Sequence, residues 1–247
     1  MISLGTVPLD GSTLLGYRAD PVGEPRGAIV LIHEIWGLVE HITDVADRYA
    51  AEGYLVIAPD ILSGVGVDPE VGAELQRLVF SADEKTRTDA QPLMREKMAP
   101  SHAPEYAAYA VASLKVAVDY LDVQPGVNGR IAVTGFCFGG GYSFALAAAD
   151  PRVTAAIPFY GSAPEGTAIA AISCPVLAIY GRNDPRIVDG VPALTEAMLD
   201  AGVPFEAKIY DDAGHAFFND TNTTTYVPDA AADAWRRSLA FLATNLD

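Results

Sequence analysis

The stretch RIAVTGFCFGGGYSFALAAA, positions 130–149, places a cysteine at an abrupt change of pattern. Its first residues are mostly apolar, as in a buried strand, whereas the run from Phe138 onward suits a helix. Between them, GFCFG has the form of the G-x-S-x-G turn, in which a nucleophile stands on a sharp strand-to-helix turn, with cysteine in place of serine. The stretch therefore predicts an α/β arrangement with Cys137 as a candidate nucleophile.

The same alternation of short apolar runs and longer helical patterns continues along the rest of the chain. Near-continuous apolar strands separated by helices are typical of a mostly parallel central sheet with helices on both faces. In such a sheet, reactive groups belong in the loops at the carboxyl ends of the strands. We expect strands at 27–33, 54–60, 130–135, 153–161, 175–181 and 204–210, helices at 40–52, 104–122, 138–149, 190–201 and 229–245, and an antiparallel edge pair near 5–8 and 13–18.

The length of 247 residues and the absence of a linker-like stretch favour one α/β domain over residues 1–247. The stretch 62–103 has no strand pattern, and we expect it to form short helices near the active site. Half of the residues are hydrophobic, yet no uncharged apolar run is long enough to span a bilayer. The first residues have neither the basic nor the apolar region of a signal peptide, so we expect a cytoplasmic protein.

The net charge of -16 and the two cysteines limit the classes of partner and of covalent structure. A strongly acidic chain repels polyanions, and its Lys and Arg residues form no dense patch, so nucleic acid and anionic membrane are excluded as partners. Cys137 and Cys174 lie at opposite ends of their expected strands, too far apart for a disulfide, so both should be free thiols. We expect neither a cofactor nor a metal ion.

A nucleophile needs a base, and the base needs an orienting group. In the order nucleophile, acid, histidine, the acid is Asp184 in the loop after one strand, and the base is His215 in the loop after the next. Asp211 and Asp212 are weaker alternatives for the acid, because they share a loop with the histidine. The other histidines, which we expect to be strand-end or surface residues, are His33, His41 and His102.

Further residues are expected around the sulfur. The turn directs the N–H of Phe138 and the start of its helix at the site, which favours a thiolate and a developing oxyanion. Ile35, in the loop after the first parallel strand, is the candidate for the second oxyanion N–H. Glu34 at the same strand end is a candidate cleft carboxylate, and Trp36 and Tyr160 are candidate pocket residues.

These motifs together resemble the dienelactone hydrolase family, a branch of the α/β-hydrolase fold with a cysteine nucleophile. The matching segments, from residue 27 to the C-terminus, are HEIWGL, GYLVIAPDI, GFCFGGG, PFYG, GRNDP and DAGHAF. The resemblance implies a Cys137–His215–Asp184 triad that hydrolyses carboxylic esters or lactones through a thioester acyl-enzyme. It also implies that Glu34 keeps the cysteine thiol unreactive until a substrate displaces the glutamate. The expected partner is a small-molecule ester or lactone.

The departures from the family pattern concern the substrate. The family's best-studied type binds a carboxylated lactone with arginines, one of them four residues after the catalytic histidine, where this chain has Asn219. We therefore expect Asn219 in the substrate site and doubt dienelactone itself as the substrate; Arg87, Arg95 and Arg186 are the other candidates to bind an anion. The alternative function is a hydrolase-fold thiol redox sensor or ligand-binding protein without ester turnover, given the accessible sulfur of low pKa that such a turn would create.

Overall fold

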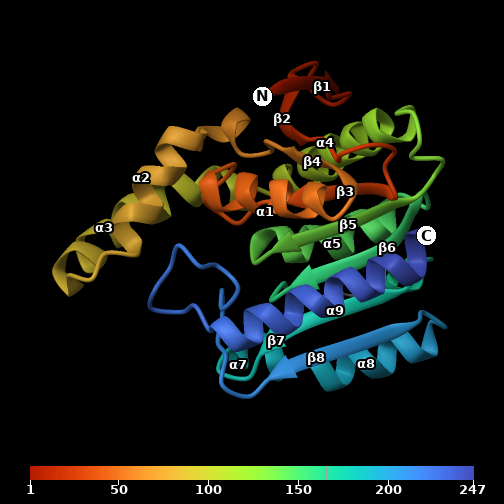
Figure 1. Ribbon diagram of the computed structural model, residues 1–247. Helices are drawn as coiled ribbons and strands as arrows, with labels where there is room; N and C mark the ends of the chain where they lie inside the picture. The colour runs from red at the N-terminus through yellow and green to blue at the C-terminus, as the bar shows by residue number, and fades with distance from the viewer. Residues whose placement is uncertain (165) are drawn as a thin grey trace.

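The computed structural model describes residues 1–164 and 166–247, which form an eight-stranded sheet covered by helices (Figure 1). The strand order is β1-β2-β4-β3-β5-β6-β7-β8, and the strands from β3 to β8 are parallel. The expected fold class is confirmed. The strands are β1 Ile2–Thr6, β2 Thr13–Ala19, β3 Gly27–Ile32, β4 Tyr54–Pro59, β5 Ile131–Phe136, β6 Val153–Phe159, β7 Val176–Gly181 and β8 Phe205–Tyr210.

The helices expected at 40–52, 104–122, 138–149, 190–201 and 229–245 all form, with each end within two residues of its expected bound. Two 3₁₀ turns, Ser63–Val65 and Ala99–His102, flank the pair α2 and α3. The helices are α1 Glu40–Ala51, α2 Pro69–Val79, α3 Glu84–Met98, α4 Tyr106–Asp122, α5 Phe138–Ala149, α6 Thr167–Ala170, α7 Pro185–Val188, α8 Val191–Asp200 and α9 Pro228–Leu246.

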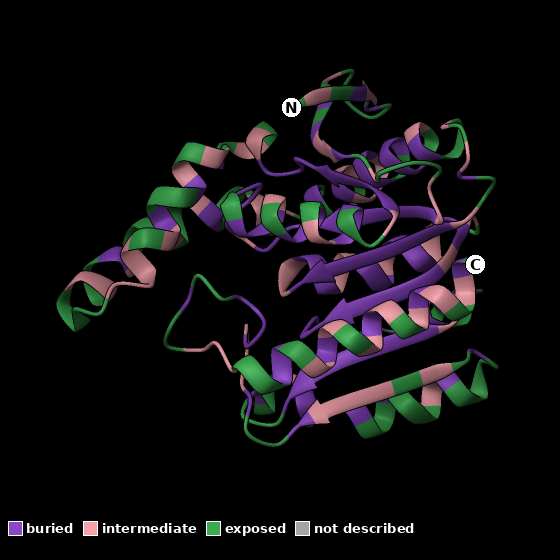
Figure 2. Ribbon diagram, viewed as in Figure 1, coloured by how far each residue is buried: buried purple, intermediate pink, exposed green. Residues whose placement is uncertain are grey.

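The sheet separates two hydrophobic cores, and β3 shows how the sequence divides between them. Successive side chains of a strand point to opposite faces. Ala28, Val30 and Ile32 pack in one core with α4, α5 and α8, whereas Ile29 and Leu31 pack in the other with α1 and α9. All five are fully buried, and β3, β4, β5 and β7 are buried along their whole length (Figure 2). This two-sided burial is why the strand reads as a continuous apolar run.

The N-terminal strands form the antiparallel edge that the sequence suggests. β1 pairs with β2, and β2 pairs antiparallel with β4. β1 covers Ile2–Thr6 and not 5–8, because the chain turns between Val7 and Ser12. Two backbone hydrogen bonds close this turn: the N–H of Val7 donates to the carbonyl of Ser12, and the N–H of Gly11 donates to the carbonyl of Val7.

The stretch 62–103 forms an arm in which α2 and α3 pack against each other and extend from the body of the molecule (Figure 1). Each helix begins at an aspartate whose side chain accepts backbone N–H groups. Asp68 accepts from Glu70 and Val71, and Asp83 accepts from Thr86. Such caps satisfy N–H groups that have no partner within the helix. The arm returns to the sheet through the 3₁₀ turn that ends at His102.

Two glycines allow β5, β3 and the start of α5 to pack in contact. A β-carbon added at Gly135 would lie 2.4 Å from the carbonyl oxygen of Gly139, and one added at Gly139 would lie 2.3 Å from the carbonyl oxygen of Ile32. Both distances are far below van der Waals contact with backbone atoms that have little freedom to move. The glycines on either side of Cys137 are therefore required by the close approach of three backbone segments.

Replacing Gly139 by alanine should lower the free energy of unfolding by about 3 kcal/mol or more, because the added methyl group overpacks a rigid backbone contact. Gly141→Ala is the matched control, since the nearest atom to its added β-carbon lies 3.7 Å away and alanine favours the helix. Chemical denaturation of both variants checks this prediction. Equal midpoints for Gly139→Ala and Gly141→Ala would contradict it.

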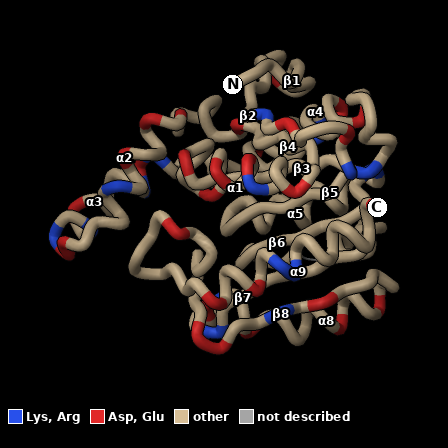
Figure 3. The backbone as a smooth tube through the Cα atoms, in the orientation of Figure 1, with Lys and Arg blue, Asp and Glu red and all other residues tan. Residues whose placement is uncertain are grey.

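The distribution of charged residues and the character of the helices can be compared with the partners expected from the sequence. In Figure 3 the Lys and Arg residues are scattered among more numerous Asp and Glu residues. Among the described residues, no helix combines the length and the apolar character needed to cross a lipid bilayer.

Candidate active site

The candidate site lies at the carboxyl edge of the parallel sheet, where five loops meet. Glu34 follows β3, Cys137 follows β5, and Tyr160 follows β6. Asp184 and His215 follow β7 and β8. Because the strands are parallel and adjacent in the order β3-β5-β6-β7-β8, residues far apart in the sequence share this one edge.

Cys137 occupies the sharp turn between β5 and α5. Its φ of 56° and ψ of -113° lie in a region that residues with a β-carbon rarely adopt. The turn is held by hydrogen bonds from the Cys137 N–H to the carbonyl of Phe159, 3.0 Å, and from the Gly141 N–H to the carbonyl of Cys137, 3.2 Å. The structure thus gives Cys137 the strained, partly exposed position of an elbow nucleophile.

His215 and Asp184 form a hydrogen-bonded pair across the loops after β8 and β7. The Nδ1 atom of His215 lies 2.5 Å from Oδ2 of Asp184. The carboxylate is buried, with 4% of its side chain exposed, whereas the imidazole is about one-third exposed at 32%. A buried carboxylate accepts the proton on Nδ1 and leaves Nε2 as the acceptor nitrogen of the ring. Asp211, by contrast, is exposed and pairs with Arg182.

Cys137 and His215 open into the same cavity, which has a volume of about 880 Å³. Phe138 and Tyr160 also line it, and so does Ile35 from the loop after β3. The ring of Tyr160 lies 5.1 Å from that of His215. A cavity of this size with a few polar groups among apolar walls is typical of a small-molecule site.

Glu34 lies behind the cavity, fully enclosed. One of its carboxylate oxygens accepts a hydrogen bond from the side-chain amide of Asn219 at 2.7 Å. Burial raises the pKa of Glu34 from its usual 4.5 to about 7, although the Asn219 hydrogen bond opposes this rise. The orientation of the Asn219 amide is fixed, because its oxygen accepts from both the N–H and the hydroxyl of Thr221. The neighbour of the thiol is therefore a carboxyl group that titrates near neutral pH.

The resting thiol itself is held protonated. Burial and the negative charge of Glu34 raise the pKa of Cys137 to about 12, and the N–H of Phe138 lowers it only in part. The expectation of a sulfur of low pKa is therefore wrong for the resting site. The sequence showed the helix N-terminus that favours a thiolate, but it did not show the desolvation, which outweighs it.

Comparison with known proteins agrees with this geometry. The family model described as the dienelactone hydrolase family matches residues 14–246. The chain belongs to the dienelactone hydrolase family. A protein of Saccharolobus solfataricus, named as a candidate carboxymethylenebutenolidase, is 34% identical over 254 aligned positions that cover 94% of this chain and 95% of that protein. A protein of Yersinia pestis with the same name is 30% identical, covering 95% of this chain and 85% of that protein.

A solved structure confirms the fold of this family member. The crystal structure of a candidate dienelactone hydrolase from Klebsiella pneumoniae superposes with a TM-score of 0.79 at 29% identity, covering 96% of each chain. The α/β-hydrolase fold and the assignment as a hydrolase are thus established.

Two residues that we expected to bind substrate in this dienelactone hydrolase family member lie outside the cavity. Trp36 is buried and packs edge to face with Phe80 at 5.5 Å, because the chain turns away from the cleft directly after Ile35. Asn219 is fully buried and contacts Glu34, so it supports the carboxylate and does not line the cavity.

Of the three arginines that we considered as anion-binding residues, one lines the cavity and two lie outside it. Arg87 donates to the carbonyls of Ser81 and Ala82 at the start of α3, and neither it nor the exposed Arg95 lines the cavity. Arg186 lines it, with 85% of its side chain exposed and Nε 4.0 Å from Oδ1 of Asp184.

Of the remaining histidines, His41 is buried within α1 and is therefore neither the strand-end nor the surface residue that we expected, whereas His102 is exposed as expected. His102 lines the cavity from the end of the arm, and no strand or motif signal in 62–103 could have located it there. His33 is a buried strand-end residue whose ring bonds to the carbonyl of Glu34 and accepts the N–H of Ile61. His41 is buried in α1, where burial lowers its pKa to about 4. The two cysteines are free thiols as predicted, and Cys174 is buried before β7.

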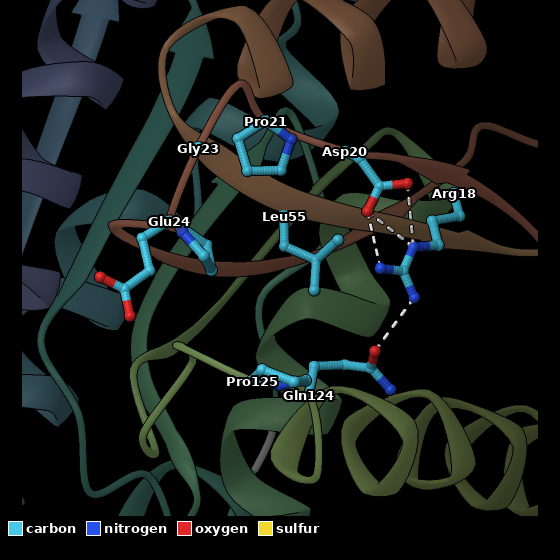
Figure 4. A pocket seen from close by; sticks show the side chains of 9 residues that line it. Arg18, Asp20, Pro21, Gly23, Glu24, Leu55, Gln124 and Pro125 are labelled. Atoms are coloured by element: carbon cyan, nitrogen blue, oxygen red, sulfur yellow. Dashed lines mark hydrogen bonds and ion pairs between the residues drawn. The ribbon is translucent and has the colours of Figure 1, made fainter.

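A second cavity, about 420 Å³, lies at the opposite edge of the sheet (Figure 4). It is bounded by the turn before β3 and by the end of α4, so it lies away from the carboxyl edge. The guanidinium group of Arg18, which lines this cavity, already forms an ion pair with Asp20 at 2.6 Å and donates a hydrogen bond to the side-chain oxygen of Gln124 at 3.0 Å. Among the described residues, no group of three or more His, Cys, Asp and Glu side chains is placed to hold a metal ion.

Proposed function

We propose that this family member hydrolyses carboxylic esters or lactones with Cys137 as nucleophile, His215 as general base and Asp184 as the group that orients the base. The observation that carries this proposal is the convergence of three loops: a strained elbow cysteine and a carboxylate-bonded histidine line one cavity. Residues in these roles must share one site, whatever their separation in the sequence.

The first half of the reaction forms a thioester. His215 Nε2 takes the proton of the Cys137 thiol, and the sulfur attacks the carbonyl carbon of the substrate. The N–H groups of Phe138 and Ile35 stabilise the resulting oxyanion. When the tetrahedral intermediate collapses, the carbon–oxygen bond to the leaving group breaks and the imidazolium gives its proton to the leaving oxygen. The acyl group then remains on Cys137.

The second half returns the free thiol. A water molecule gives a proton to His215 as its oxygen attacks the thioester carbonyl, and the carbon–sulfur bond breaks when the second tetrahedral intermediate collapses. The sulfur leaves as a thiolate and takes the proton back from His215. Asp184 keeps the imidazole in the required tautomer in both halves.

Glu34 acts in this proposal as a restraint on the resting thiol. Its carboxylate, when ionised, opposes formation of a second negative charge at Cys137. The pKa of Glu34 is about 7, so this restraint is absent well below neutral pH, where the carboxyl is neutral, and present above it.

The Glu34→Gln variant tests this restraint. Gln can still accept the Asn219 hydrogen bond but carries no charge, so the pKa of the Cys137 thiol should fall. We expect the iodoacetamide alkylation rate of Cys137 to match the wild type below about pH 6 and to exceed it by about three- to tenfold above about pH 8, since one pKa unit corresponds to tenfold in thiolate.

The matched control is Glu40→Gln, which removes an exposed carboxylate six positions further on at the start of α1. Mass spectrometry assigns the alkylation to Cys137 and not Cys174. Equal alkylation rates for Glu34→Gln and the wild type above pH 8, or a slower rate, would remove the proposed restraint.

The raised pKa of Cys137 speaks against the alternative function as a thiol redox sensor. Sensor cysteines react with peroxide as thiolates and are typically of low pKa and well exposed. At a pKa of about 12 the resting thiolate fraction is very small. A stable sulfenate at low peroxide together with no turnover of any ester would favour the sensor.

The direct test of the proposed function is to trap the acyl group. Acid quenching during p-nitrophenyl acetate turnover, followed by peptide mass spectrometry, should show an acetyl group on the peptide that contains Cys137. Turnover with no modified cysteine under any quench condition, and with no inhibition by iodoacetamide, would contradict the thioester route.

A further inference from the structure

The cavity continues well beyond the reacting groups, along the first two turns of α5. Cys137 precedes this helix, and Phe138, Tyr142 and Ala145 of the helix all line the cavity. Residues spaced in this way share one face of a helix. With a rise of about 1.5 Å per residue, Ala145 lies about 12 Å along the axis from Cys137. The wall that begins at the sulfur thus consists of aromatic and alanine side chains over this distance, and among the described residues of this wall no ionisable acid or base interrupts it other than the phenol of Tyr142.

Three helices contribute small side chains to the lining of this cavity. Ala107 of α4, Ala145 of α5 and Ala168 of α6 line it, and each carries only a methyl group. Ile187 of α7 adds a further apolar side chain. Four helices therefore contribute apolar surface around a space that the small alanines leave unfilled.

The charged residues of the lining do not interrupt this apolar surface. Arg186 extends into solvent with 85% of its side chain exposed, and His102 is exposed as well. The acidic groups of the site, Glu34 and Asp184, are buried and lie outside the described lining. An uncharged apolar group on the substrate would therefore gain more from this space than a charged one, because it buries hydrocarbon without desolvating an ion.

We infer that the preferred substrates are esters whose acyl group is an uncharged chain of hexanoyl to octanoyl length, which lies along α5 from Cys137 to Ala145. This inference rests on the proposed function. The acyl group, and not the alcohol, is assigned to this space because it becomes bonded to the sulfur at which the apolar wall begins. Ala107, Ala145 and Ala168 then set the chain length.

The test compares kcat/KM for p-nitrophenyl acetate, butanoate, hexanoate and octanoate, and for a hexanoyl-length ester that ends in a carboxylate. Each methylene buried against the wall should raise kcat/KM by up to about fourfold. We expect hexanoate to exceed acetate by at least about tenfold, and to exceed the carboxylated ester by a similar factor. A flat series, or faster turnover of the carboxylated ester, would overturn the inference.

A matched pair of variants on α4 places the effect in the cavity. Both positions are exposed, but Ala107→Leu adds its atoms at the lining of the cavity, whereas Ala108→Leu adds the same atoms outside the lining. The hexanoate-to-acetate ratio should fall about tenfold in Ala107→Leu and should stay at the wild-type value in Ala108→Leu. The same ratio in both variants would overturn the inference, and circular dichroism checks that both fold.

Failure of this inference can be told apart from failure of the proposed function. If acetate is hydrolysed through a Cys137 thioester but the chain-length series is flat, the substrate class is wrong and the mechanism stands. If no ester in the series is hydrolysed, or if turnover does not need Cys137, both are wrong.

Discussion

Cys137→Ala should hydrolyse p-nitrophenyl esters at least about 10⁴-fold more slowly than the wild type in kcat/KM, because loss of a nucleophile removes most of the rate that such a triad provides. The backbone should keep its fold, since alanine retains the β-carbon and the strained φ of 56° is held by the surrounding hydrogen bonds. Initial rates with the acetate and hexanoate esters, at matched protein concentration, measure the loss.

Cys174→Ala is the matched control for this variant. Cys174 is the second free thiol of the chain, but it is buried before β7, at the end of the sheet opposite the cavity. Its replacement should leave kcat/KM within about twofold and lower stability only by the small amount expected for a truncated buried side chain. Turnover that survives in Cys137→Ala, or that disappears equally in both variants, would refute the assignment of Cys137 as the nucleophile.

Asp184→Asn should lower kcat/KM by about 10²- to 10⁴-fold while leaving the geometry of the loop nearly unchanged. The amide has the shape of the carboxylate, but its NH₂ group can donate to Nδ1 of His215 at the observed 2.5 Å contact, which places the ring proton on Nε2. In that tautomer the imidazole cannot accept the thiol proton. Loss of the negative charge also removes support for the imidazolium.

Asp211→Asn provides the matched control for the acid. Asp211 lies on the same loop as His215, four positions before it, yet it is exposed and pairs with Arg182. This substitution should change kcat/KM less than twofold. A larger loss of kcat/KM in Asp211→Asn than in Asp184→Asn would show that Asp211, the alternative that the sequence left open, orients the histidine.

Most of the fold could be predicted because hydrophobic periodicity reports burial directly. The strand at 27–32 is apolar at every position, since its two faces pack against different helical layers, and that pattern needs no partner to be recognised. The segment 62–103 was harder to interpret, because its helices pack mainly against each other and carry few buried residues. Nothing in its sequence indicated that His102 reaches the cavity.

The sequence by itself determined the strand-to-helix turn at Cys137, the order of Cys137, Asp184 and His215 along the chain, and the family. Glycines two positions on either side of a cysteine, between a strand and a helix, form a motif that can be recognised within seven residues, although the backbone contact that requires Gly139 is made with Ile32 of β3. The tertiary structure decided the chemical state and the surroundings of these residues. In the structure Asn219 contacts Glu34 and not the substrate cavity, Trp36 packs outside the cavity, and burial raises the pKa of Cys137. Desolvation and contacts across 185 positions arise only when the loops meet, so no local pattern records them.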